Sequence, residues 1–202
     1  INSEAKPEIV AFEYTEAGVS GISVLTDEAF FGGKDQDLLS IKEVVATPVL
    51  RKDFVIDSYQ IHEAKALGAD VILLIARILN PDQTKEFTEI AQGLGLEVLL
   101  ETHSEQEIEK HYFDSIDLIG INNRDLDTFQ VDIENSIRLA QSLPKESIKI
   151  AESGLGNPET VIRMNENGFD GFLMGEAFMK HAYPGRACKK FIEQLKPVSH
   201  EN

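Results

Sequence analysis

Lys52 and Glu101 are the two ionisable residues whose positions most strongly suggest chemistry. Each ends a short, mostly apolar run, at residues 49–52 and 97–101. Successive strand residues point to opposite faces, so one of Arg51 and Lys52 must point into the fold. A carboxylate at the end of an apolar strand is costly to bury unless it is paired or used in chemistry. A Lys–Glu pair in a shielded pocket is a common way to tune an acid and a base, and we predict such a pair here.

Structural explanations of the same two residues remain open. Lys52 is followed by Asp53, so an ion pair between these neighbours would account for the lysine. Glu101 would need no catalytic role if it only neutralised Lys52. The second explanation is compatible with a functional site, because a neutralising pair also places an acid beside a base.

Further polar residues follow the next apolar run. Asn122 ends residues 118–122, where its amide group suits hydrogen bonds to a substrate hydroxyl or ring. Arg124 and Asp125 come directly after it. These two residues either contribute to the site or brace each other across its edge.

Two later loops carry small residues of the kind that bind phosphate. They span residues 151–156, with Glu152, Ser153 and Gly154, and residues 174–177, with Gly175 and Glu176. Small residues let backbone N–H groups approach an anion, and a short helix beginning after Gly175 would lie behind it. We predict a phosphorylated ligand; the alternative is that these are ordinary turn glycines.

Two adjacent aromatic residues, Phe30 and Phe31, stand before a Gly-Gly pair. The segment 30–33 therefore resembles a flexible, lid-like loop with exposed rings. An aromatic substrate would explain them. The alternative is that the two rings pack over the top of the fold whether or not a ligand is present.

One pattern repeats seven times along the chain. A short β-branched run ends in polar residues, and an amphipathic helical stretch follows before the next run. The runs are residues 21–25, 49–52, 71–75, 97–101, 118–122, 148–151 and 171–175. Apolar strands that alternate with amphipathic helices predict an α/β fold with a parallel sheet covered by helices.

Between the two architectures of this class, a (β/α)8 TIM barrel fits better than a doubly wound sheet. No G-x-G-x-x-G follows any run, and polar residues mark the carboxyl end of almost every one, which in a barrel is the active-site rim. A barrel needs eight strands, and the sequence provides about seven. We therefore expect residues 1–202 to form one TIM-barrel domain that is incomplete in this chain, with the first strand belonging before Ile1.

The composition excludes several classes of protein. The net charge is −16, and no Lys/Arg run exceeds two residues, which argues against a nucleic-acid partner. No apolar run approaches the roughly 18 residues of a membrane span, and the start of the chain is no signal peptide, so we expect a cytoplasmic protein. Cys188 is the single cysteine, and the five histidines lack zinc-ligand spacing. We expect no metal site, and surface or hydrogen-bonded histidines.

These residues together resemble the indole-3-glycerol-phosphate synthase family, an indole-forming barrel of tryptophan biosynthesis. Four stretches carry the likeness, residues 22–33, 48–54, 120–126 and 151–154, and it extends from Asn2 to about Arg186. The resemblance implies the substrate 1-(o-carboxyphenylamino)-1-deoxyribulose 5-phosphate. It also implies ring closure, loss of CO2 and loss of water, without a cofactor or metal, in a monomer or weak homodimer.

The resemblance also implies a role for each candidate residue. Lys52 is the general acid at the substrate carbonyl oxygen, and Glu101 transfers protons during dehydration. Asn122 and Glu152 orient the ribulose hydroxyls and the anilino nitrogen. Phe31 and Phe54 flank the anthranilate ring, and Arg124 supports the rim. The phosphate is held, largely through backbone groups, by Ser153, Gly154, Gly175 and Glu176. A lysine suits this role if its surroundings lower its pKa toward the working pH.

One departure from the family stands out. Its first strand carries a Glu-Ile-Lys segment followed by a Ser-Pro-Ser turn, and an extra N-terminal helix caps the barrel; none of these precedes Ile1. We therefore expect residues 1–202 alone to have impaired turnover.

Two alternatives compete with this interpretation. Another phosphate-binding barrel, such as phosphoribosylanthranilate isomerase or the tryptophan synthase α subunit, would not explain residues 51–54 together with Glu101 and Asn122. A non-catalytic barrel fragment would not be expected to retain every candidate catalytic residue.

Overall fold

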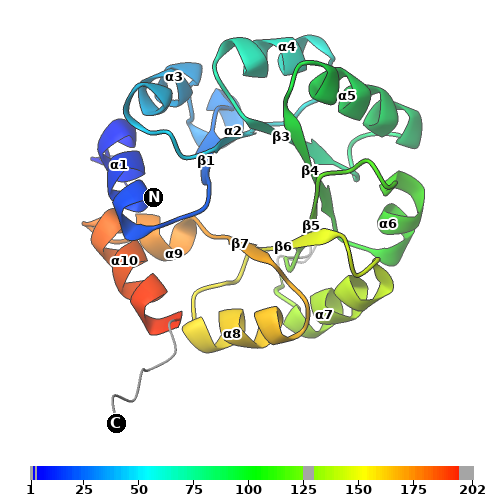
Figure 1. Ribbon diagram of the computed structural model, residues 1–202. Helices are drawn as coiled ribbons and strands as arrows, with labels where there is room; N and C mark the ends of the chain where they lie inside the picture. The colour runs from blue at the N-terminus through cyan, green and yellow to red at the C-terminus, as the bar shows by residue number, and fades with distance from the viewer. Residues whose placement is uncertain (1, 3, 125–129, 196–202) are drawn as a thin grey trace.

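The seven predicted strands form one parallel sheet that curls into an incomplete barrel (Figure 1). The computed structural model describes residues 2, 4–124 and 130–195. The strands are β1 (Ile22–Leu25), β2 (Val49–Lys52), β3 (Val71–Ile75), β4 (Glu97–Thr102), β5 (Leu118–Asn122), β6 (Ile148–Glu152) and β7 (Gly171–Leu173). Each strand pairs with the next in sequence order, so β1 and β7 are the two edges of the sheet. The predicted α/β barrel class, incomplete in this chain, is confirmed.

Helices surround the sheet and connect its strands (Figure 1). They are α1 (Pro7–Ala17), α2 (Glu28–Phe31), α3 (Asp35–Val44), α4 (Tyr59–Ala66), α5 (Pro81–Gly93), α6 (Glu105–His111), α7 (Ile133–Ser142), α8 (Pro158–Glu166), α9 (Glu176–Met179) and α10 (Pro184–Leu195). Proline opens α5 and α8, because its missing N–H is not needed in a first turn. Asp132 caps α7, its side chain accepting the N–H of Asn135. Among the described residues, no helix is long and apolar enough to cross a membrane.

One difference from the sequence-based expectation and one confirmed prediction lie near the barrel opening. The segment predicted as a lid-like loop begins as the short helix α2, because Asp27 accepts the N–H of Phe30 and caps it. The short helix expected after Gly175 is present as α9. Both short helices follow the carboxyl end of a strand, and they therefore shape the same end of the barrel as the candidate residues.

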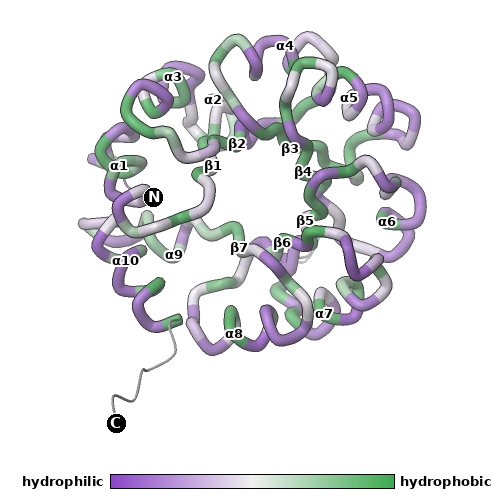
Figure 2. Tube along the Cα trace, viewed as in Figure 1, coloured by the Kyte–Doolittle hydropathy of each residue, from purple (hydrophilic) through white to green (hydrophobic). Residues whose placement is uncertain are grey.

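Apolar side chains pack on both faces of the sheet. Residues between the strands and the helices form the outer core, and Figure 2 shows the matching pattern of hydrophobic strands and hydrophilic outer helix faces. Inside the barrel a smaller cluster is built from alternate strand residues, Leu50, Val71, Leu73, Ile75 and Leu99. This cluster fills the space beneath the polar carboxyl ends of the strands.

The helices α1 and α10 pack against each other outside the opening between β1 and β7. Gly185 of α10 permits the close approach, because a Cβ atom there would overlap the side chain of Glu13 on α1. The helix layer is therefore continuous at the place where the sheet is not.

Candidate active site

Strand register brings Lys52, Glu101 and Glu152 together at the carboxyl end of the barrel. Each is at or next to the end of its strand, β2, β4 and β6, and each points inward because the residues on either side of it point outward. Lys52 Nζ lies 3.4 Å from Glu101 Oε2 and 3.5 Å from Glu152 Oε2. The two carboxylates are almost fully buried, while a quarter of the Lys52 side chain remains exposed. The predicted Lys52–Glu101 pair is thus present, with Glu152 as a third member.

Arg51 lies on the opposite face of β2 and forms an ion pair with Asp53, the residue that could have paired with Lys52. Its guanidinium group lies 3.2 Å from Asp53 Oδ2 and 2.7 Å from Glu63 Oε2. Asp53 also accepts a hydrogen bond from the Thr26 hydroxyl. Asp53 therefore belongs to a structural network outside the barrel, and an ion pair between Lys52 and Asp53 does not explain the lysine.

Asn122 fixes the orientation of the Glu101 carboxylate. Its Nδ2 donates a hydrogen bond to Glu101 Oε1 at 3.2 Å, and its Oδ1 accepts one from the backbone N–H of Arg124 at 3.0 Å. Because the bond from Arg124 occupies the amide oxygen, the amino group of Asn122 is the side that faces Glu101, and only this side can donate. Asn122 thus lies within the cluster that the sequence predicted.

The charges around Lys52 shift its pKa upward. Burial alone would lower the pKa of Lys52, but the charges of Glu152 and Glu101 outweigh burial and hold that pKa above its ordinary value. The condition that the surroundings lower this pKa is therefore not met, because two carboxylates from other strands face one ammonium group.

Glu152 shows the opposite effect of the same cluster. Burial and the neighbouring charge of Glu101 raise its pKa to about 8, although Lys52 acts against them. Glu152 therefore keeps its proton to a higher pH than an ordinary carboxyl group and is suited to donate one. Its Oε1 has no hydrogen-bond partner among the described residues.

His103 joins this cluster although the sequence did not single it out. Its ring lies between two carboxylates, with Nε2 3.3 Å from Glu101 Oε1 and Nδ1 3.4 Å from Glu107 Oε2. The only sequence signal was its position two residues after Glu101, just beyond the strand end. Of the two expected kinds of histidine, His103 is the hydrogen-bonded kind and not the surface kind.

The predicted phosphate loops adopt backbone conformations that suit small residues. Ser153 and Gly154 have φ values of 66° and 70°, in the left-handed region that favours glycine. A Cβ atom at Gly154 would also overlap the side chain of Val131. Asn123 Nδ2 donates to the carbonyl oxygen of Ser153 at 2.7 Å and holds the loop beside β6.

The rim residue Arg124 reaches the second loop. Its guanidinium group lies 3.7 Å from Glu176 Oε2, at the start of α9. Asp125, the partner that the sequence offered for Arg124, lies outside the described residues. The contact with Glu176 links the loop after β5 to the loop after β7, where Gly175 precedes α9.

Phe31 and Phe54 form one aromatic surface at the edge of the opening. Their rings are stacked with centroids 5.6 Å apart, and Phe30 meets Phe54 edge-on at 5.5 Å. The two rings are thus in direct contact with each other. That they flank a substrate ring stays a prediction.

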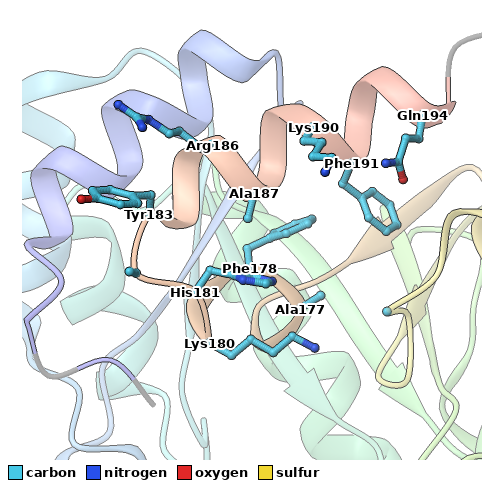
Figure 3. A pocket seen from close by; sticks show the side chains of 12 residues that line it. Ala177, Phe178, Lys180, His181, Tyr183, Arg186, Ala187, Lys190, Phe191 and Gln194 are labelled. Atoms are coloured by element: carbon cyan, nitrogen blue, oxygen red, sulfur yellow. The ribbon is translucent and has the colours of Figure 1, made fainter.

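A separate hollow lies on the outside of the barrel between α9 and α10 (Figure 3). Its volume is about 600 Å³, and its walls combine aromatic residues such as Phe178 and Phe191 with the basic residues Lys180, Arg186 and Lys190. None of its lining residues belongs to the cluster around Lys52.

Comparison with known proteins identifies the family. The sequence profile described as "Indole-3-glycerol phosphate synthase" matches residues 1–192. The chain belongs to this family. The indole-3-glycerol phosphate synthase of Bacteroides thetaiotaomicron is 48% identical over 196 residues, covering 96% of this chain and 75% of the relative. That of Caldanaerobacter subterraneus is 46% identical over 187 residues, covering 93% and 72%.

Solved structures of other proteins share the fold of this family member. A 3-hexulose-6-phosphate synthase superposes with a TM-score of 0.78 at 13% identity, covering 95% of this chain and 94% of its own. Orotidine 5′-phosphate decarboxylase from Pyrococcus horikoshii gives 0.75 at 12% identity, covering 98% and 97%. A tryptophan synthase α-subunit from Pyrococcus furiosus gives 0.68 at 16% identity, covering 95% and 94%. These likenesses concern the fold alone.

Proposed function

We propose that the chain converts 1-(o-carboxyphenylamino)-1-deoxyribulose 5-phosphate into indole-3-glycerol phosphate, the carboxy-lyase step of tryptophan biosynthesis. The single observation that carries the proposal is the placement of Lys52 between the carboxyl groups of Glu101 and Glu152 in a chain of this family. The reaction joins a ring carbon to a carbonyl carbon and releases CO2 and water. Its electrons balance without an external oxidant or reductant, so it requires no redox cofactor.

Lys52 is the general acid in this proposal. Its raised pKa keeps the ammonium group charged at neutral pH, so it can donate a hydrogen bond to the substrate carbonyl oxygen and then a proton. Protonation makes the carbonyl carbon electrophilic and later lets the oxygen leave as water. The two neighbouring carboxyl groups position the ammonium group, because an oxygen of each lies within 3.5 Å of Lys52 Nζ at the barrel opening.

The two carboxyl groups take different roles because their surroundings differ. Glu152, with a pKa of about 8, is the protonated partner and can donate to the substrate nitrogen or a hydroxyl group. Glu101, bound by Lys52 and Asn122, is the acceptor that removes a proton during dehydration. Asn122 can also meet the substrate hydroxyl groups at the same place.

The ends of the substrate are bound by the loops around this cluster. The backbone of Ser153 and Gly154, with Gly175 and Glu176 at the start of α9, binds the phosphate group in this proposal. Arg124 braces this edge through Glu176. The aromatic surface of Phe31 and Phe54 supports the anthranilate ring. With the phosphate bound at one side and the anthranilate ring at the other, the reacting carbon atoms would lie between them, above Lys52.

Indole fluorescence offers a direct test of the activity. The chain contains no tryptophan, so a purified protein contributes no indole background of its own. We expect product formation by the unsubstituted protein and a loss of about a hundredfold or more in kcat for Lys52→Ala. Lys85→Ala, which removes an exposed lysine on α5, is the matched control and should leave turnover unchanged. Near-normal turnover of Lys52→Ala would show that the assignment of the acid is wrong.

The extent of turnover by residues 1–202 alone stays a separate prediction. In the described part of the chain, the edge strands β1 and β7 are not paired with each other. We expect residues 1–202 to show measurable but impaired activity, because two unpaired sheet edges leave the barrel open. Turnover at the level of the relatives would contradict that expectation without affecting the assignment of Lys52.

A further inference from the structure

The ring of His103 is placed between two acids that belong to different parts of the barrel. Glu101 is the last residue but one of β4 and points into the barrel, whereas Glu107 belongs to the first turn of α6. Nε2 of the ring lies 3.3 Å from Glu101 Oε1, and Nδ1 lies 3.4 Å from Glu107 Oε2. Only 7% of the His103 side chain is exposed. The ring is therefore a buried bridge between the reacting cluster and a helix.

Local structure holds this bridge in place. Glu107 Oε2 accepts the backbone N–H of His103 at 2.7 Å, and Ser104 accepts the backbone N–H of Glu107 as the cap of α6. Burial would raise the pKa of Glu107, but its hydrogen bonds with the ring and backbone of His103 outweigh burial and lower that pKa. Glu107 therefore stays ionised and fixes both the backbone and the ring of His103.

The contact with Glu101 differs from the contact with Glu107. Nε2 is fully shielded from solvent and has no hydrogen-bond partner among the described residues, although it lies 3.3 Å from Glu101 Oε1. A buried donor or acceptor without a partner is costly, so this nitrogen gains from any approach of the carboxylate. Glu101 Oε1 is thus the group that this end of the ring faces.

We propose, on the basis of the function proposed above, that His103 is a positioning residue for Glu101. Its ring lies beside Oε1 of Glu101, the oxygen that also accepts the hydrogen bond from Asn122 Nδ2. The other carboxylate oxygen, Oε2, is then free to face Lys52. His103 has no contact with Lys52, so it acts through Glu101 alone. Glu107 supplies the fixed end of this support, and its loss would release the ring.

Two substitutions separate the two contacts of the ring. The amide nitrogen of Gln can reach the place of Nε2, so His103→Gln keeps a donor for Glu101. That of Asn reaches the place of Nδ1, so His103→Asn keeps only the contact with Glu107. We expect His103→Asn to lower kcat between about tenfold and a hundredfold with KM changed little, because a misplaced catalytic group affects the transition state. His103→Gln should retain most of the activity.

His111→Gln is the matched control for these variants. His111 is also buried on α6, but its Nδ1 contacts the hydroxyl of Thr84, 2.8 Å away, and not Glu101. We expect its substitution to change thermal stability and leave kcat unaltered. Equal kcat values for the unsubstituted chain, His103→Gln and His103→Asn would overturn the proposal. An equal loss of kcat in His103→Gln, His103→Asn and His111→Gln would also overturn the proposal, because it would show a general effect of disturbed packing.

A second measurement decides the same question without turnover. The ring nitrogens of His103 can be followed by 15N NMR at one fixed pH. The charged groups that face the ring are Glu101 and Glu107, with Lys52 beyond the first and Arg77 acting on the second. We expect the 15N resonances of the ring to shift in Glu101→Gln, because the carboxylate beside Nε2 is lost, and to stay unchanged in Glu105→Gln, which alters an exposed residue of α6.

The two measurements separate the two proposals. Unchanged 15N resonances of the His103 ring in Glu101→Gln overturn the role of His103, whatever the activity. An absence of indole formation in the unsubstituted protein counts against the proposed function, and the NMR comparison then still decides whether His103 senses Glu101.

Discussion

Gly120 of β5 and Glu152 of β6 share one space inside the barrel. A Cβ atom at Gly120 would overlap Oε1 of Glu152, and it would also meet Leu99. The glycine is thus the reason that a carboxyl group can lie fully buried above the inner cluster.

Substitution of Gly120 by alanine should therefore displace Glu152. We expect Gly120→Ala to lower the free energy of unfolding by about 1–3 kcal/mol, as overpacking does, and to reduce kcat. Urea unfolding and the indole assay measure the two effects. Gly93→Ala is the control, since nothing lies near its added methyl group at the end of α5. If Gly120→Ala unfolds like the unsubstituted chain, the close packing around Glu152 is wrong.

The raised pKa of Glu152 predicts how stability depends on pH. The pKa of Glu152 is about 8 in the folded chain and lower in the unfolded chain. As pH rises, the unfolded chain therefore loses this proton first. Stability from this residue is therefore complete below the unfolded pKa and declines as pH rises toward the folded pKa, with a slope of at most about 1.4 kcal/mol per pH unit.

Glu152→Gln should remove this decline. We expect the variant to gain stability relative to the unsubstituted chain as pH rises from about 5 to 8, measured by urea unfolding at each pH. Glu109→Gln, which alters an exposed residue of α6, should show no such trend. A stability difference that does not change with pH would mean that Glu152 is ionised in the folded protein.

Gly154→Ala tests the phosphate loop. The left-handed φ and the nearby side chain of Val131 both oppose a methyl group, so the loop must shift. We expect KM to rise about tenfold or more with a smaller change in kcat, because phosphate binding is shared by ground and transition states. Gly156→Ala is a control in the same loop, where an added Cβ meets nothing. Equal KM values for the two variants would argue against backbone binding at Gly154.

Phe31→Leu tests the aromatic surface. The change keeps an apolar group on α2 but removes the ring that stacks on Phe54, which costs about 0.5–1.5 kcal/mol for an aromatic pair. We expect weaker substrate binding of corresponding size, seen as an increase in KM. Leu39→Ala, which truncates an exposed side chain on α3, serves as the comparison. The surface has no part in binding if Phe31→Leu leaves KM at the unsubstituted value.

Much of the fold was predictable because it depends on local patterns. Apolar runs about 25 residues apart, with helix start signals such as Pro81 and Asp132 between them, predict alternating strands and helices. Polar residues at strand ends predict a shared edge, because parallel strands place their carboxyl ends together. Lys52, Glu101, Asn122 and Glu152 were all found in this way.

Only the tertiary structure decided what surrounds each of these residues. The direction of the pKa shift of Lys52, the partners of Arg51 and the stacking of Phe31 on Phe54 each depend on segments far apart in the chain. No sequence pattern indicated a role for His103, because that role depends on the carboxylates that lie on either side of its ring. The sequence by itself determined which side chains line the barrel opening. Their charge states and orientations depend on distances between strands, and electrostatic interactions follow those distances.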